Sequence, residues 1–156
     1  VAVDVGYGQL AWELRQDPRV KILDRTNIRH LTGEMVGEEI DLVVADLSFI
    51  SLSLVLPALA AVSRPNADYV LMVKPQFEVG REKLGAGGVV RDPALRRAAV
   101  LDVAEAAYDV GLGTMGIAAS PLPGPAGNVE YFLWLRRGAP AIDEAALDRA
   151  IEIGPQ

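Results

Sequence analysis

The sequence contains no cysteine, one histidine and no apolar run long enough to cross a bilayer. Without cysteine the chain has no disulfide and no thiolate ligand for zinc, which suits a reducing compartment. The lone histidine, His30, has no second ligand or nucleophile of matching type, so we interpret it as a surface residue and predict no metal site. A transmembrane helix needs about 20 apolar residues in succession. We therefore predict a cytoplasmic protein with no membrane association.

Positive charge is also scarce. The 15 Lys and Arg residues are outnumbered by 21 Asp and Glu residues, which gives a formal net charge of −6. A protein that binds nucleic acid over a broad surface neutralises phosphates with excess Lys and Arg. Any nucleic-acid affinity of this chain must therefore be local, or must come from a region outside it.

The sequence does contain an alternation of β-rich runs and helical segments. Its 156 residues, 51% of them hydrophobic, fit one globular domain with a sizeable core. Strands followed by helices favour a mostly parallel, doubly wound α/β sheet. The runs at 115–119 and 129–135 have no helix between them, so they should form an antiparallel hairpin at one end of the sheet. This combination is typical of the methyltransferase variant of the nucleotide-binding fold.

Three charged residues lie at predicted strand ends. The run 40–50 is apolar on both alternating faces, which predicts a buried parallel strand with Asp46 at its carboxyl end, where α/β sheets bind ligands. The next strand, 68–73, ends at Lys74, and Glu130 begins the last one. Each has a plainer interpretation, because Asp46 suits a helix cap, Lys74 a surface charge and Glu130 a cross-strand partner.

Two further strand ends carry polar residues. The run 1–5 is closed by Gly6 and Gly8 and carries Asp4 at its end. An acid in that position either accepts hydrogen bonds from a ribose or caps the turn. Asp24 and Arg25 follow the run 21–24 and add polar groups to the same edge. Helices are predicted at 9–16, from Leu52 to Arg64 with Pro57 in an early turn or kink, from Asp92 to Val110, and after Asp143.

The segment from Gln76 to Pro93 is rich in glycine and basic residues, which predicts a flexible basic loop. It lacks the Gly-x-x-x-x-Gly-Lys-Ser/Thr pattern of a phosphate-binding P-loop. It is either an ordinary mobile loop or a substrate-side lid that concentrates positive charge on an acidic protein. The basic residues that such a lid would present are Arg81, Lys83 and Arg91.

Five motifs, in this order along nearly the whole chain, resemble the TlyA (hemolysin A) family of FtsJ-like methyltransferases. They are Val3-Asp-Val-Gly-Tyr-Gly-Gln9, Ala45-Asp-Leu-Ser-Phe-Ile-Ser51, Val73-Lys-Pro-Gln-Phe-Glu-Val-Gly-Arg81, Gly87-Gly-Val-Val-Arg-Asp92 and Gly127-Asn-Val-Glu130. The resemblance implies a Rossmann-like class I methyltransferase fold. It also implies S-adenosylmethionine-dependent methylation of cytidine 2′-hydroxyls in ribosomal RNA, with ribosomal subunits as partners.

The resemblance also assigns residues to a site. FtsJ-like enzymes are associated with a Lys-Asp-Lys-Glu tetrad, and Asp46, Lys74 and Glu130 match its last three members. On the cofactor side, Asp4 would contact the ribose, Asp24 with Arg25 would lie near the adenine, and Asp46 would face both cofactor and substrate.

Some features that the resemblance implies are not found in this sequence. They are the first lysine of the tetrad, the first strand with its glycine-rich cofactor loop, and an S4-type RNA-binding domain. The chain also opens on Val1, within a β-rich run. We therefore expect residues 1–156 to be a partial methyltransferase domain that, alone, binds the cofactor weakly or not at all. Its unpaired sheet edges are prone to self-association.

A ribose hydroxyl is a poor nucleophile that must be held in line and stabilised as negative charge develops. Asp46 beside Lys74 favours a charged lysine that orients the hydroxyl, with Glu130 fixing the position of that lysine, although a role as general base stays open. The alternative function is a non-catalytic RNA- or ribosome-binding module of the same fold. A haemolytic role has no amphipathic or spanning segment to support it.

Overall fold

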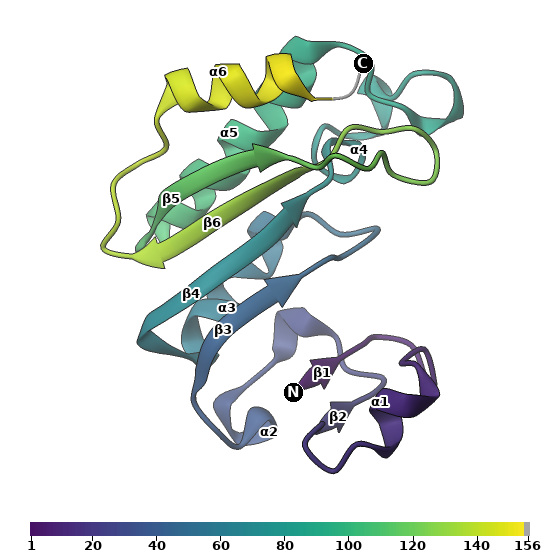
Figure 1. Cartoon of the computed structure of the whole chain (residues 1–156), viewed down its shortest axis with the longest axis vertical. Coiled ribbons are helices and arrows are strands. Elements are labelled where there is room, and N and C mark those ends of the chain that lie inside the picture. The colour runs from purple at the N-terminus through teal and green to yellow at the C-terminus, as the bar shows by residue number, and fades with distance from the viewer. Residues whose placement is uncertain (155–156) are drawn as a thin grey trace.

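The computed structural model describes residues 1–154 (Figure 1). The strands are β1 (Ala2–Val3), β2 (Ile22–Leu23), β3 (Ile40–Ala45), β4 (Ser63–Val73), β5 (Leu112–Ala119) and β6 (Tyr131–Arg137). The α-helices are α1 (Trp12–Gln16), α2 (Gly33–Val36), α3 (Leu56–Val62), α4 (Pro75–Glu78), α5 (Pro93–Asp109) and α6 (Glu144–Ile153). Short 3₁₀ turns are η1 (Ile28–His30), η2 (Leu52–Leu54), η3 (Arg81–Lys83) and η4 (Ala86–Gly88).

The strands form two separate sheets. Four of them make a sheet of order β3-β4-β6-β5, in which β3 is parallel to β4 while β6 runs antiparallel to both of its neighbours. The predicted α/β class and the antiparallel terminal hairpin are thereby confirmed. The other two strands, β1 and β2, pair in parallel as a small sheet of their own.

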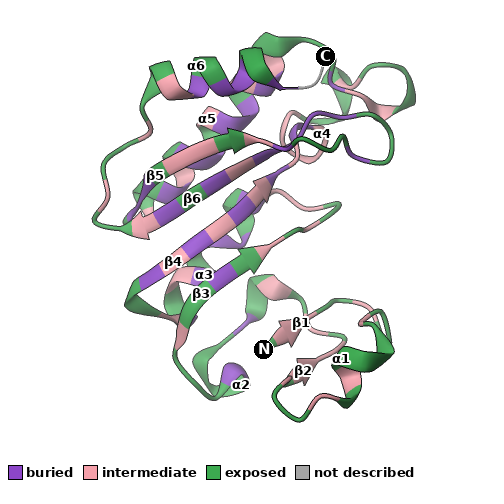
Figure 2. Ribbon diagram, in the orientation of Figure 1, coloured by how far each residue is buried: buried purple, intermediate pink, exposed green. Residues whose placement is uncertain are grey.

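The core lies on one face of the larger sheet. Tyr69, Leu71 and Val73 alternate along β4 with half-buried residues, so one face of the strand is packed and the other is not. The packed face is covered by α3 and α5, which lie behind the sheet in Figure 1. Figure 2 shows the same alternation on β6, where Tyr131, Leu133 and Leu135 are buried.

The prediction that β3 is buried on both faces is wrong for this structure. Leu42 is 55% exposed and Val44 is 72% exposed, whereas Val43 on the opposite face is buried. The reason is that β3 is an edge strand, and within residues 1–154 no helix covers the face that carries Leu42 and Val44.

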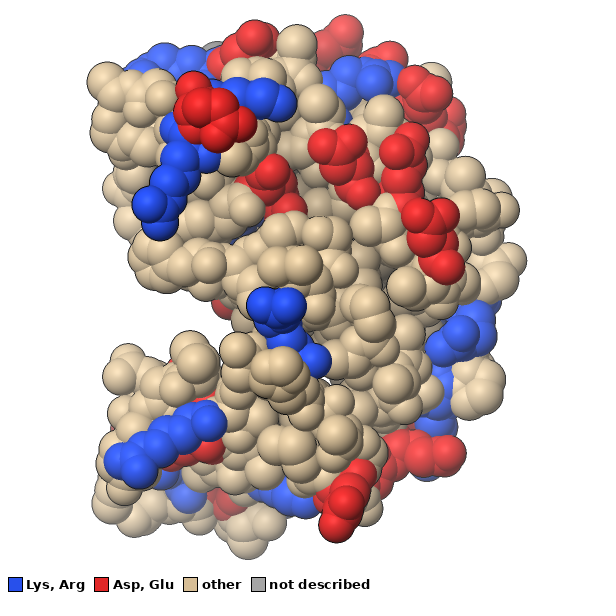
Figure 3. Space-filling model, turned by 180° about the vertical axis from the view of Figure 1, so that it is seen from behind, with Lys and Arg blue, Asp and Glu red and all other residues tan. Residues whose placement is uncertain are grey.

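An opening separates β3 from the small sheet. It forms a pocket of about 240 Å³, to which Val1 and Val3 contribute from one side and Leu42 and Val44 from the other. Figure 3 shows a deep notch between the part of the molecule that contains the small sheet and the rest. The edge strands β1 and β3 of the two sheets therefore lie on opposite sides of an apolar gap.

The predicted helix signals are largely confirmed. Asp92 accepts a hydrogen bond from the backbone N–H of Ala94 at the start of α5, and Pro93 occupies the first turn. Pro57 lies in the first turn of α3, where a missing N–H is harmless. The segment 76–93 is not one irregular loop, however, because α4, η3 and η4 fold it into short helical turns. Among residues 1–154, no helix is long and apolar enough to cross a bilayer.

Candidate active site

Asp46 and Lys74 meet at the carboxyl ends of two adjacent parallel strands. The pairing of Ala45 with Leu71 places the residues that follow β3 beside those that follow β4. The Nζ atom of Lys74 lies 2.5 Å from Asp46 Oδ1 and 3.2 Å from Ser48 Oγ. The lysine side chain is 12% exposed and that of Asp46 is 68% exposed. A largely buried lysine is thus paired with a carboxylate that is open to solvent.

Glu130 lies at the same edge but contacts a different residue. Its carboxylate is buried just before β6 and accepts a hydrogen bond of 2.9 Å from Gln76 Nε2. The ion pair of Lys74 within residues 1–154 is with Asp46, and Glu130 forms none with that lysine. The contact that links Glu130 to this part of the site is its hydrogen bond to Gln76, two residues after Lys74 in the sequence.

A carboxylate that sequence reasoning did not single out joins the two loops. Glu78, at the end of α4, accepts a hydrogen bond of 2.5 Å from Ser51 Oγ and one of 2.9 Å from the backbone N–H of Leu52. Burial raises the pKa of the Glu78 carboxyl, and these hydrogen bonds partly oppose that rise. Glu78 thereby ties the segment after Lys74 to the segment after Asp46. No local pattern marks this role, because its partners lie 26 and 27 residues away.

Phe49 is a second residue that sequence reasoning missed. Its side chain is 91% exposed, and its backbone has a φ of 64°, a left-handed conformation that bulky residues seldom adopt. Its ring centroid lies 5.0 Å from that of Phe77. The residue next to Ser48 and Lys74 therefore presents an aromatic surface to solvent, of the kind on which a nucleic-acid base stacks.

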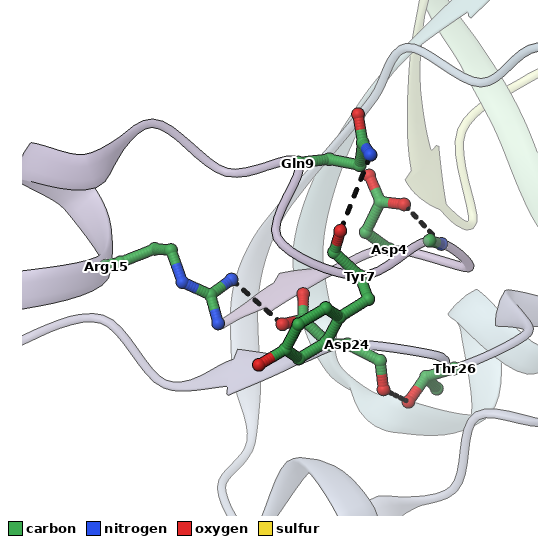
Figure 4. Close-up of polar contacts among 7 residues, drawn as sticks. Asp4, Tyr7, Gln9, Arg15, Asp24 and Thr26 are labelled. Atoms are coloured by element: carbon green, nitrogen blue, oxygen red, sulfur yellow. Dashed lines mark hydrogen bonds and ion pairs between the residues drawn. The ribbon is translucent and has the colours of Figure 1, made fainter.

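Two of the predicted cofactor residues, Asp4 and Asp24, lie at the small sheet (Figure 4). Asp4 Oδ1 accepts a hydrogen bond of 2.7 Å from the backbone N–H of Gly6, so this carboxylate caps the glycine turn. Asp24 forms an ion pair of 2.8 Å with Arg15 of α1. Arg25 has a φ of 53°, and its guanidinium lies 4.6 Å from the centre of the Tyr7 ring.

Asp4 and Asp24 line one pocket of about 190 Å³. Carboxylate oxygens at a strand end suit the hydroxyls of a ribose, so the acceptors fit that part of S-adenosylmethionine. The volume is below the roughly 300–1,000 Å³ of most small-molecule sites, so this pocket has room for only part of the cofactor. Asp46 lines the separate opening between the two sheets.

The basic residues predicted for the substrate side lie on the segment after α4. Arg81 and Lys83 are exposed within η3, and neither forms an ion pair within the described part of the chain. Arg91 is exposed near η4 and donates a hydrogen bond of 3.4 Å to the carbonyl of Ala86. Over residues 1–154, no group of three or more His, Cys, Asp and Glu side chains is placed to hold a metal ion.

The chain is similar to several known proteins. The chain is 58% identical to the 16S/23S rRNA (cytidine-2'-O)-methyltransferase TlyA of Mycobacterium tuberculosis over 99% of its own length and 60% of that protein's. It is 43% identical to the putative rRNA methyltransferase YqxC of Bacillus subtilis over 86% of its length and 48% of the relative's. A solved putative hemolysin from Streptococcus thermophilus superposes with a TM-score of 0.91 at 37% identity, over 97% of this chain and 56% of that one.

The chain thus spans about half to 60% of the length of these relatives. Residues 1–137 match the FtsJ-like methyltransferase family itself. The resemblance predicted from the five sequence motifs is confirmed, and the chain belongs to the FtsJ-like methyltransferase family.

Proposed function

We propose that this chain is the catalytic part of an S-adenosylmethionine-dependent enzyme that methylates cytidine 2′-hydroxyls in ribosomal RNA. The observation that carries the proposal is the Lys74–Asp46 pair at the junction of β3 and β4, the edge at which such sheets bind ligands. Support comes from the relative in Mycobacterium tuberculosis, whose name states this reaction. Work on ribosomal RNA suits a cytoplasmic protein.

Lys74 is proposed to act on the ribose hydroxyl. Its ammonium lies 2.5 Å from Asp46 and its side chain is only 12% exposed, so the position of the charge is well defined. A positive charge fixed in that way holds the hydroxyl oxygen and stabilises the negative charge that develops on it. Asp46 orients the ammonium, and Ser48 supplies a further polar contact. Glu130 acts more remotely, by fixing Gln76.

The cofactor supplies an electrophilic methyl group on a sulfonium. On this chain, Asp4 would hold the ribose of its adenosine, with Asp24 and Arg25 beside the adenine. Asp4 keeps its turn closed through Gly6 while it does so. These residues would bind and orient the cofactor, whereas Lys74 and Asp46 act at the substrate hydroxyl.

The substrate RNA would lie across the edge where α4 and the following turns project. Arg81 and Lys83 are exposed cations that can neutralise phosphates. Phe49 offers a stacking surface next to the lysine. On the face shown in Figure 3, Lys and Arg side chains are dispersed instead of forming one broad basic surface, which agrees with local contacts to RNA.

We further propose that the gap between β1 and β3 takes a parallel strand from outside residues 1–156. Both strands present unpaired edges to it, and its walls are apolar. A strand inserted there would join the two sheets into one and bring the Asp4 pocket and Asp46 to a single site. Residues 1–156 alone would accordingly bind S-adenosylmethionine weakly.

The proposal is tested by transfer of a labelled methyl group from S-adenosylmethionine to ribosomal subunits, with the complete protein. Lys74→Ala should lower kcat by about 10²- to 10³-fold, the loss typical of one group that stabilises a developing oxyanion. Lys83→Ala, which removes an exposed cation, should raise KM for RNA and leave kcat close to wild type. A Lys74→Ala protein that folds and retains full kcat would instead support a non-catalytic role for this pair.

A further inference from the structure

One arginine of this acidic protein is buried without a countercharge. Arg96, in the first turns of α5, retains 3% of its exposed area, and its Nε atom has no hydrogen-bond partner. No carboxylate within residues 1–154 lies close enough to form an ion pair with it. Buried charges in proteins are normally paired, because removal of an ion from water is strongly unfavourable.

The neighbouring arginine on the same helix, Arg97, does form ion pairs. Arg97 lies 2.6 Å from both Glu144 and Asp148 of α6, on the exposed side of α5. Arg96 faces the Tyr131 side chain instead. Burial raises the pKa of the Tyr131 hydroxyl, and the opposing effect of Arg96 is smaller. That hydroxyl is therefore neutral at physiological pH and cannot balance the guanidinium.

Arg96 lies at the wall of a pocket of about 520 Å³. One side of this pocket is the segment 89–91, with Arg91, and the other is the segment 123–129. Asn128 holds the two sides together, because its buried amide accepts a hydrogen bond of 2.9 Å from Val90 N–H and donates one of 3.1 Å to the Gly88 carbonyl. The pocket is thus built by fixed loops, with one buried cation and a second, exposed cation.

We propose that this pocket binds a phosphate group through Arg96, with Arg91 at its rim. A guanidinium matches the oxygens of a phosphate in both charge and geometry. The inference rests on the proposed function, because the phosphate is then a backbone phosphodiester of the substrate RNA close to the reactive ribose. Val129 of the pocket is adjacent to Glu130, which is hydrogen-bonded to Gln76 beside Lys74.

The first test uses inorganic phosphate and thermal unfolding of the complete protein, at constant ionic strength against chloride. A ligand that binds only the folded state raises the unfolding midpoint. Phosphate should raise the midpoint of the wild type and of the matched control Arg97→Gln, and should leave that of Arg96→Gln unchanged. Arg96→Lys, which keeps the charge, should retain part of the response. An equal response in wild type and Arg96→Gln would overturn the phosphate site.

The second test measures RNA binding as a function of salt. Arg96→Gln removes one phosphate contact, so the slope of log K against log salt should become shallower by about 0.7–0.9. Its RNA affinity should fall about ten- to hundredfold. Arg97→Gln should show neither change. A phosphate response that depends on Arg96, without any change in RNA binding, would show a site for free phosphate and overturn the RNA assignment. Neither readout requires methyl transfer, so failure of the catalytic proposal is seen separately.

Discussion

Phe49 combines an exposed ring with a left-handed backbone, and neither feature favours folding. At 91% exposure the ring gains little from burial, and a φ of 64° is unfavourable for a side chain of this size. Features of this kind are concentrated at functional sites. Phe49 also follows Ser48, whose hydroxyl contacts Lys74, which supports the stacking role proposed for its ring.

We expect Phe49→Ala to weaken RNA binding by about 1–3 kcal/mol, the contribution of one base stacked on an aromatic side chain. The free energy of unfolding should stay within about 0.5 kcal/mol of wild type, as for other exposed substitutions. The measurements are a binding titration with substrate RNA and chemical denaturation. Phe49→Tyr, which keeps the ring, is the control and should bind like wild type. Wild-type affinity in the alanine variant would exclude stacking.

The buried carboxyl of Glu78 should make the free energy of unfolding depend on pH. Burial raises its pKa in the folded protein above the ordinary value near 4.5. The folded state therefore holds this proton more tightly than the unfolded state. The protonated Glu78 carboxyl therefore contributes fully to the free energy of unfolding below about pH 4.5, and this contribution is lost as pH rises through the raised pKa. Glu78→Gln cannot ionise, so its stability relative to wild type should increase from pH 4 to pH 8 in denaturation experiments. A difference that is independent of pH would contradict the assignment.

At the scale of elements, the beginning of β5 depends on a close approach of two backbones. The N–H of Thr114 donates a hydrogen bond of 2.7 Å to the Pro140 carbonyl, so the segment after β6 covers this edge of the sheet. A Cβ atom at Gly113 would lie 1.8 Å from the Ala139 carbonyl oxygen. A Cβ atom at Gly116, on the same strand, would meet its nearest neighbour, in the Trp134 ring, at 3.7 Å.

We therefore expect Gly113→Ala to destabilise the protein by about 1–3 kcal/mol or more, because backbone must move to make room. Gly116→Ala is the matched control and should be neutral or stabilising by up to about 1 kcal/mol. Chemical denaturation of the two variants provides the comparison. Equal stabilities would show that the 139–140 segment does not pack against β5 in solution.

Elements with strong local signals were predictable from the sequence. Asp92 and Pro93 mark the start of α5, and the absence of a helix between β5 and β6 indicates their antiparallel pairing. The positions of Asp46 and Lys74 followed from the same logic of strand ends. Glu78 and Arg96 could not be found in this way, since their roles depend on partners or burial that arise only when distant segments pack.

At the scale of the molecule, β3 forms an open edge of the larger sheet, and within residues 1–154 no helix covers the face that carries Leu42 and Val44. Leu42, Val44 and Trp134 are exposed there, although each is large and apolar. The run that forms β3 is apolar at alternate positions on both faces, so burial of both faces was predicted. The prediction was wrong because the sequence does not show which segments will cover each face of a strand. Exposed apolar edges of this kind favour association with other chains.

We expect residues 1–156 in isolation to self-associate through this edge. Replacing Leu42 and Val44 together by lysine should give a monomer, because charges on an edge strand oppose strand addition. Leu122→Lys, in an exposed loop, is the control and should leave association unchanged. Sedimentation velocity over a concentration series reports the result. A wild-type chain that is monomeric throughout would contradict the expectation.

The chemical identity of the methylated nucleoside tests the central claim most directly. Ribosomal subunits treated with the complete protein and S-adenosylmethionine should yield 2′-O-methylcytidine on nucleoside analysis by mass spectrometry. Lys74→Ala should reduce that product about 10²- to 10³-fold while its unfolding midpoint stays close to wild type. A methyl group found on a base, or an undiminished yield of 2′-O-methylcytidine from Lys74→Ala, would contradict the account.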